Sequence, residues 1–196
     1  MGYCKERCML LAVGLVVVLS GCASFREGKL PDITQWPPAG GAKGKSITVV
    51  FTGQAISTDV NKANPHGWYE NAIAQAYRDS KLFSEVKTGA AGGDLLAEVK
   101  LIHRGEANLL MAVLTGLTLY LIPSSGTDEF TFRTAIKDKQ GTVIGMVEKT
   151  EAINFWQQMF LIFVYPFKNP NTVFTDTISD LNRATVIEAN AKGYFN

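Results

Sequence analysis

The chain has 196 residues, of which 46% are hydrophobic and 19% are charged, and its formal net charge is +1 at pH 7. A chain so close to neutrality has no strong field for gathering nucleic acid, and its length allows one substantial core. Composition therefore argues against a nucleic-acid partner and predicts a single globular domain behind any N-terminal segment.

The first residues have the layout of a secretory signal peptide. Lys5 and Arg7 give a net positive head, and residues 9–19 are apolar apart from one glycine. As a helix this apolar stretch would span about 16 Å, which is short against a hydrocarbon core of about 30 Å. We therefore expect residues 1–21 to be a cleaved signal peptide and not a permanent membrane span.

The end of that segment, Leu19-Ser20-Gly21-Cys22, resembles the lipobox of bacterial lipoproteins, in which a branched apolar residue and two small residues precede a cysteine. The resemblance implies cleavage between Gly21 and Cys22, a diacylglycerol on the Cys22 thiol, and an N-acyl chain such as palmitate on the new amino group. It also implies the periplasmic face of the outer membrane, because Ala23 stands where an aspartate would retain the protein in the inner membrane. Three fatty chains exceed the threshold for stable anchoring, so the lipid bilayer is the partner expected through Cys22.

Cleavage would leave 17 basic and 17 acidic side chains, because Lys5, Arg7 and Glu6 depart from totals of 19 and 18. It would also remove two of the three cysteines, and acylation would use the third, so we expect no disulfide and no cysteine metal site. Residues 22–45 contain many prolines and glycines, which interrupt any regular period. We expect a flexible lipidated tether at 22–45 and a single α/β domain at 46–196.

Residues 39–46, AGGAKGKS, fit a loose form of the phosphate-binding loop. Such a loop works where a buried strand leads into a helix whose N-terminal amides hold the phosphates. Here two prolines precede the motif and a strand pattern follows it, so we predict that no nucleotide binds.

The first half of the domain reads as strand, helix, strand. Residues 46–55 carry apolar or β-branched side chains on both faces, which is typical of a central strand. Asn64-Pro65 predicts a helix start, and apolar residues follow at helical spacing to about Ser80. Residues 95–103 alternate again as a strand, and a crossover through the helix places the two strands parallel.

The second half reads as a hairpin and a final helix. Residues 128–137 and 142–153 alternate on either side of the turn KDKQG, in which Gly141 accepts a positive φ. Residues 175–192 form the last helix, with Ile178, Leu181, Thr185 and Ile187 on its buried side.

These elements predict an α+β fold, with one mixed sheet of about four strands in the order β-α-β-β-β-α and helices packed on it. The order resembles small α/β domains of envelope lipoproteins, including those that serve secretion and lipopolysaccharide assembly. The resemblance is one of topology and implies no particular activity.

Two apolar segments exceed the needs of such a domain: residues 107–127 and 152–167 contain no charged side chain. The strand directions place both at one edge of the sheet, and both are expected to be largely helical. They form a local subcore, dip into one leaflet with aromatic side chains at headgroup depth, or dock an envelope partner. The candidate membrane or partner contacts are Leu110, Leu114, Leu117, Tyr120, Trp156, Phe160 and Phe163.

Little in the sequence points to catalysis or to metal binding. Neither His66 nor His103 has a second histidine four residues away, and no nucleophile elbow is present. Four charged residues at strand ends read as a solvated rim: Arg104, Glu106, Asp128 and Glu129. We predict no catalytic residue, no metal and no cofactor besides the acyl chains.

The sequence thus predicts a membrane-anchored, non-catalytic envelope lipoprotein that binds or assists another envelope component. The alternative is a membrane-inserting or pore-assembling lipoprotein that acts through residues 107–127 and 152–167.

Overall fold

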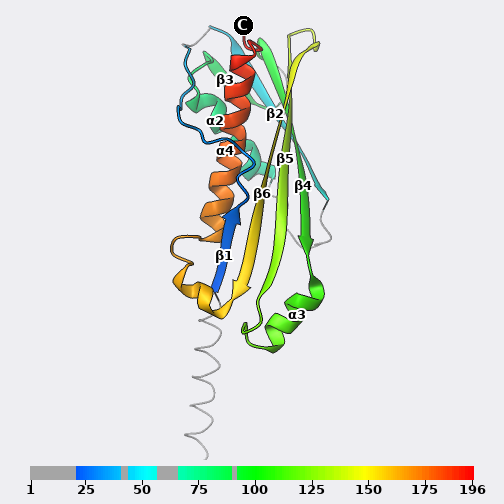
Figure 1. Ribbon diagram of the computed structural model, residues 1–196. Coiled ribbons are helices and arrows are strands. Elements are labelled where there is room, and N and C mark those ends of the chain that lie inside the picture. The colour runs from blue at the N-terminus through cyan, green and yellow to red at the C-terminus, as the bar shows by residue number, and fades with distance from the viewer. Residues whose placement is uncertain (1–20, 41–43, 57–65, 90–91) are drawn as a thin grey trace, which may run out of the picture. The chain divides into compact units, whose positions relative to one another are not determined.

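The computed structural model describes residues 21–40, 44–56, 66–89 and 92–196 (Figure 1). The elements in chain order are β1 (Gly21–Arg26), β2 (Ser46–Ile56), α2 (His66–Asp79), β3 (Glu85–Thr88), β4 (Leu95–Ala107), α3 (Leu109–Leu117), β5 (Ser124–Lys137), β6 (Val143–Gln158), the 3-10 helix η1 (Met159–Phe163) and α4 (Pro170–Ala191). The expected signal peptide, apart from Gly21, and the expected helix start at Asn64-Pro65 lie outside the described residues.

The strands form one mixed sheet of six strands in the order β1-β6-β5-β4-β2-β3. The prediction of a sheet of about four strands is therefore wrong. The prediction omitted two strands. The first is β1, of which residues 22–26 lie in the expected tether. It pairs antiparallel with β6, so that Gly21 lies opposite Gln158. The second is β3, four mostly exposed residues that pair parallel with β2. Neither carries an alternating apolar pattern, so pairing with a neighbouring strand, and not local sequence preference, makes them strands.

Other parts of the predicted order are confirmed. Strands β2 and β4 pair in parallel, from Ile47 opposite Leu95 to Ile56 opposite Arg104. In the hairpin between β5 and β6, Gly141 has a φ of +82° and its N–H donates to the Asp138 carbonyl at 3.0 Å. A glycine suits this position because a left-handed backbone conformation strains other residues.

By its internal contacts the chain divides into two compact units. Among the described residues, unit 1 comprises 21–26, 106–128 and 153–174. Unit 2 comprises the described parts of Glu27–Gly105, Glu129–Ala152 and Thr175–Asn196.

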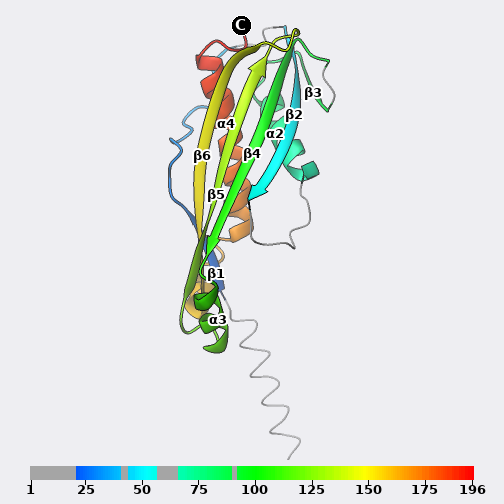
Figure 2. The same ribbon diagram turned by 90° about the vertical axis from the view of Figure 1, so that its right-hand side faces the viewer.

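The main core belongs to unit 2, where α2 and α4 lie on the same face of the sheet (Figure 2). In β5 the alternate residues from Phe130 to Ile136 are buried, and they face the buried stripe of α4. That stripe includes Ile178, Leu181 and Thr185, as the helical spacing predicts, while Ile187 is half-buried. Burial of these apolar faces against each other is the main contribution to the stability of the unit.

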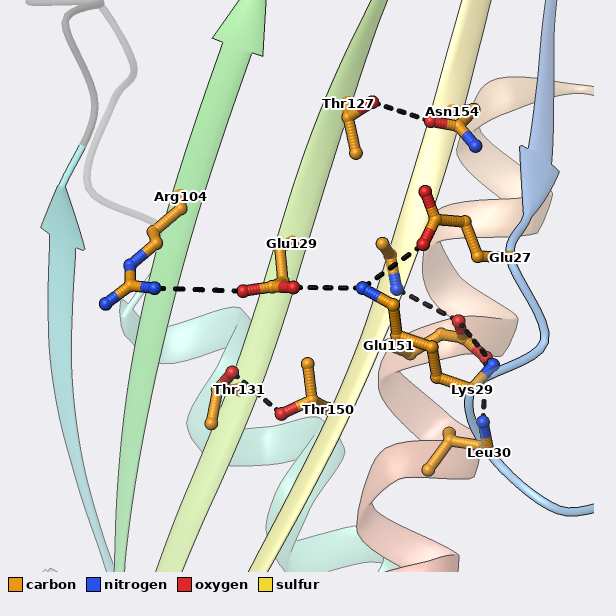
Figure 3. A network of polar contacts seen from close by, with 11 residues as sticks. Glu27, Lys29, Leu30, Arg104, Thr127, Glu129, Thr131, Thr150, Glu151 and Asn154 are labelled. Atoms are coloured by element: carbon orange, nitrogen blue, oxygen red, sulfur yellow. Dashed lines mark hydrogen bonds and ion pairs between the residues drawn. The ribbon is translucent and has the colours of Figure 1, made fainter.

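The chain that follows β1 is fastened within unit 2 by Glu151, whose side chain is fully buried (Figure 3). Its Oε1 accepts hydrogen bonds from the backbone N–H of Lys29 at 3.1 Å and of Ala152 at 2.9 Å. Its Oε2 accepts from the N–H of Leu30 at 3.3 Å. A carboxylate that accepts several backbone N–H groups repays part of the cost of its burial, and here it also holds the strand that supplies them.

Further along, the same segment lies against α4. The Arg183 guanidinium is 5.7 Å from the centre of the Trp36 ring, and Asn190 Nδ2 donates to the Ala39 carbonyl at 3.1 Å. Trp36 therefore packs on its own unit. The structure differs here from the tether expected at 22–45, because residues 22–30 and 36–39 contact folded elements.

Candidate functional site

The candidate site is a cluster of exposed apolar side chains in unit 1, which we call the apolar surface. It consists of α3, the loop that follows α3, and η1 with the residues just after it. Its exposed members are Leu109, Leu110, Val113, Leu117, Leu119, Leu121, Ile122, Phe160, Phe163, Tyr165 and Phe167, with Trp156 of β6 beside them in sequence.

Polar side chains in and beside helix α3 form hydrogen bonds with its backbone. Asn108 caps the N-terminus, and its Oδ1 accepts from the Met111 N–H at 3.1 Å. Thr115 and Thr118 each donate a side-chain hydroxyl to the carbonyl four residues earlier, both at 2.8 Å. These bonds give the Met111 N–H and the two threonine hydroxyls partners within the chain, which a lipid environment would not supply.

Most of the apolar side chains of α3 are exposed to solvent. Thr115 is the only residue of α3 that is buried, whereas Leu109, Leu110 and Leu117 are 78%, 68% and 76% exposed. The segment is predicted as a helix and forms one, but it does not form the subcore that was one of the three sequence-based alternatives.

Residues 152–158 of the second apolar segment, which was expected to be largely helical, lie instead in strand β6, because residues 153–158 pair with β1. The 3-10 helix η1, which follows them, is exposed as α3 is. None of its residues is buried, and Phe163 is 77% exposed. The Met159 N–H donates to the Tyr120 carbonyl at 3.0 Å, which joins η1 to the loop after α3. Figures 1 and 2 show α3 and η1 at the same end of the two paired strands β1 and β6. The two uncharged segments thus come together in one unit, as the strand directions predict.

Cys22 lies in the same unit, in β1, opposite Gln157 of β6. Its neighbour Gly21 packs so closely on η1 that a Cβ there would collide with the backbone of Leu161 and Ile162. Partial burial raises the pKa of the Cys22 thiol, so the thiol is protonated at neutral pH. It lacks the lowered pKa of an activated nucleophile, and among the described residues it is the one free cysteine.

The structure brings most of the sequence-predicted contact residues to the surface. Leu110, Leu117, Trp156, Phe160 and Phe163 are exposed, while Leu114 and Tyr120 are half-buried. Sequence reasoning missed other members of the apolar surface, among them Leu109, Leu119 and Phe167. The uncharged segments themselves were the signal for these residues. Helical spacing picks out one side of a helix, whereas apolar side chains occur on all sides of these segments.

The four residues of the predicted polar rim fall into different units. In unit 2, Arg104 Nη1 lies 4.0 Å from Glu129 Oε1, and Lys29 Nζ bridges Glu129 and Glu27 at 3.0 and 3.1 Å (Figure 3). Glu106 and Asp128 belong to unit 1. These ion pairs are partly exposed, so each contributes little to stability.

In unit 2, a groove of about 520 Å³ lies between α4 and the segment at 31–39. The Lys149–Glu188 ion pair, 2.6 Å between Nζ and Oε2, lies in its wall. His103 does not line this groove, and its ring stacks on the Phe130 ring with the centroids 4.5 Å apart. Within the described ranges, no cluster of three or more His, Cys, Asp or Glu side chains is arranged to hold a metal ion.

The helices in the described part of the chain include none that is both long enough and apolar enough to cross a membrane. No protein-family model matches the chain, and no curated protein matches it.

Several solved structures are similar to the chain at low identity. The PelC dodecamer from Paraburkholderia phytofirmans is 10% identical, covers 84% of this chain and 97% of its own, and has a TM-score of 0.37. A neuraminyllactose-binding hemagglutinin homolog from Helicobacter pylori is 8% identical, with 62% and 69% covered and a TM-score of 0.36. A minor lipoprotein from Acinetobacter baumannii is 14% identical, with 78% and 90% covered and a TM-score of 0.33. One similar structure is thus a lipoprotein, but likenesses this distant carry no argument about function.

Proposed function

We propose that this chain is a bacterial lipoprotein, acylated at Cys22 and held on the periplasmic face of the outer membrane. The observation that carries the proposal is the sequence Leu19-Ser20-Gly21-Cys22 after a positive head and a short apolar run. Acylation needs a thiol that no disulfide has consumed, and Cys22 is a free cysteine. In this proposal the role of Cys22 is to carry lipid and not to catalyse a reaction.

Within that role, unit 2 binds or assists another envelope component without catalysis. The ion pairs between neighbouring strands of the sheet support this, because their side chains are partly exposed. Arg133 Nε lies 2.6 Å from Glu148 Oε2, and Lys137 Nζ lies 2.6 Å from Glu98 Oε1. A polar, partly charged sheet face is suited to reversible recognition of a protein.

Membrane fractionation of the protein from a Gram-negative host, with an alkyne-labelled palmitate in the medium, tests the proposal. We expect label on the wild-type protein and sedimentation with the outer membrane on a sucrose gradient. The Cys22→Ser variant should lose the label. Equal labelling of both proteins, or a wild-type protein without label, would overturn acylation at Cys22.

The sucrose gradient identifies which membrane holds the protein, because a substitution at the sorting position 23 cannot be used for this purpose. An aspartate at position 23 is the usual retention signal, but Ala23 is 0% exposed in β1. Ala23→Asp would bury a charge and disturb folding as well as sorting.

A second candidate function is membrane insertion or pore assembly through residues 107–127 and 152–167. The observation that favours it is the exposure of the apolar surface, since isolated soluble proteins rarely leave so many large apolar side chains in water. Release of a dye from vesicles by the protein separates pore assembly, which predicts release, from simple surface contact, which does not.

A further inference from the structure

The lipid anchor has no linker. If Cys22 carries lipid, as proposed above, the acyl chains leave the protein from a residue that is itself in the sheet. Cys22 pairs with Gln157, and Ala23 pairs with Trp156. Each residue of extended chain reaches at most about 3.5 Å, so no free segment separates the bilayer surface from β1.

The apolar surface is directly next to that attachment point. Cys22 pairs with Gln157, two residues before η1 begins at Met159, and the Ser24 N–H donates to the Lys168 carbonyl at 3.1 Å. The exposed Phe160 and Phe163 belong to the same five-residue helix. The chain therefore joins the lipid attachment point to η1 without any flexible element between them.

Charge is nearly absent from the parts of unit 1 that the structure describes. Over residues 21–26, 106–128 and 153–174 the charged side chains are Arg26, Glu106, Asp128 and Lys168. All four lie outside α3, the loop after it and η1. A surface without charges enters a hydrocarbon phase without the cost of desolvating ions, and aromatic side chains such as Trp156 and Tyr165 suit the interfacial region.

We infer that the apolar surface of unit 1 rests in the phospholipid leaflet that holds the acyl chains, so that α3 and η1 lie in the interface beside Cys22. Helix α3 has nine residues, about 14 Å long, and therefore lies along or dips into one leaflet. The occupant of this surface is lipid because the proposed acylation brings a bilayer, and no other molecule, to this point of the fold. The bilayer then covers side chains that would otherwise remain in water.

The test uses the chain from residue 22 onward with Cys22→Ala, so that neither acyl chains nor residues 1–21 contribute to binding. Trp36→Phe and Trp68→Phe leave Trp156 as the single fluorescent reporter. The probe is a vesicle of phosphatidylethanolamine with a minor fraction of phosphatidylglycerol. Flotation gives the partition coefficient, and quenching by brominated acyl chains gives the depth of Trp156.

We expect flotation with the vesicles, quenching of Trp156, and little change when salt is raised. In the double variant Leu117→Glu, Phe163→Glu the partition coefficient should fall by about tenfold or more, because two charges enter the interface.

Both side chains are more than three-quarters exposed, so the variant is expected to fold. The matched control, Val143→Glu with Met146→Glu, changes exposed apolar residues of unit 2 and should leave binding unchanged. If circular dichroism shows that the glutamate variant is unfolded, Leu117→Ser with Phe163→Ser replaces it.

Three results would overturn the inference. The first is a folded parent chain that does not float, and the second is equal flotation of the parent chain and the folded double variant. The third is a parent chain that dimerises without floating and becomes monomeric in the double variant, since the surface would then bind a second copy. None of these results depends on acylation, which labelling of the wild-type protein measures separately.

Discussion

At the scale of single residues, Glu151 does the most to place the chain after β1. A glutamate in the middle of a strand usually faces solvent, so its sequence position predicts no structural role for Glu151. Glu151 stands at an inward position between Lys149, which pairs with α4, and Ile153. It accepts hydrogen bonds from the backbone N–H groups of residues 29, 30 and 152, and a sequence pattern does not predict such bonds.

Replacing Glu151 with alanine leaves three backbone N–H groups without this acceptor in a buried site. We expect a loss of about 1–3 kcal/mol in the free energy of unfolding, measured by urea denaturation. Glu148→Ala, which removes a half-exposed partner of Arg133, serves as the control and should cost less than about 1 kcal/mol. Equal losses for the two variants would show that Glu151 does not fasten the segment.

Asp94 makes folding depend on pH in the acid range. Lys139 Nζ lies 2.6 Å from its Oδ1, and the N–H and hydroxyl of Ser46 donate to its Oδ2 at 2.8 and 2.7 Å. The ammonium of Lys139 first, and then the two Ser46 donors, hold the pKa of Asp94 well below its ordinary value of 3.8. Because the folded pKa is the lower one, this carboxylate stabilises the fold above pH 3.8, and the effect fades as the pH falls further.

The Asp94→Asn variant should therefore be less stable than the wild type at neutral pH. The difference should shrink as the pH is lowered through about 3.8, when Asp94 of the unfolded wild type takes up its proton. Urea denaturation of both proteins across this range measures it. A difference that stays constant with pH would contradict the assigned ion pair.

At the scale of elements, periodic segments were predictable and paired segments were not. The helical spacing of α4 and the alternation of β5 and β6 each reflect one buried face, so the sequence alone located them. Strand β1 has small and polar residues, GCASFR, and owes its conformation to β6. Its existence depends on a partner more than a hundred residues away, which local reasoning does not reach.

Helix α3 shows a different limit of sequence reasoning. Its residues LLMAVLTGL predict a helix, but a segment that is apolar all round does not indicate which side is buried. Only the structure separates the subcore alternative from an exposed surface.

A stability measurement checks this exposure of α3. The double variant Leu110→Ser, Leu117→Ser should change the free energy of unfolding by no more than about 1 kcal/mol, because both side chains are mostly in solvent. Leu181→Ala in α4, at a fully buried position, should cost about 2–5 kcal/mol. A serine variant as unstable as Leu181→Ala would mean that α3 packs into a core.

At the scale of the whole molecule, Cys22, the proposed lipid attachment site, lies in the same unit as the apolar surface. The sequence predicted the attachment residue and the meeting of the two uncharged segments. It did not predict that Cys22 itself lies in a strand, because the prolines and glycines of residues 22–45 favour a flexible tether. If Cys22 carries the proposed lipid, unit 1 is attached to the membrane through a residue of the sheet and not through a flexible tether.

The most direct test of this account is the intact mass of the protein purified from bacterial membranes. We predict a chain that begins at Cys22 and carries the added mass of a diacylglycerol and an N-linked acyl chain, with both additions on the N-terminal peptide. A protein that retains residues 1–21, or one whose Cys22 is an unmodified thiol, would contradict the central claim.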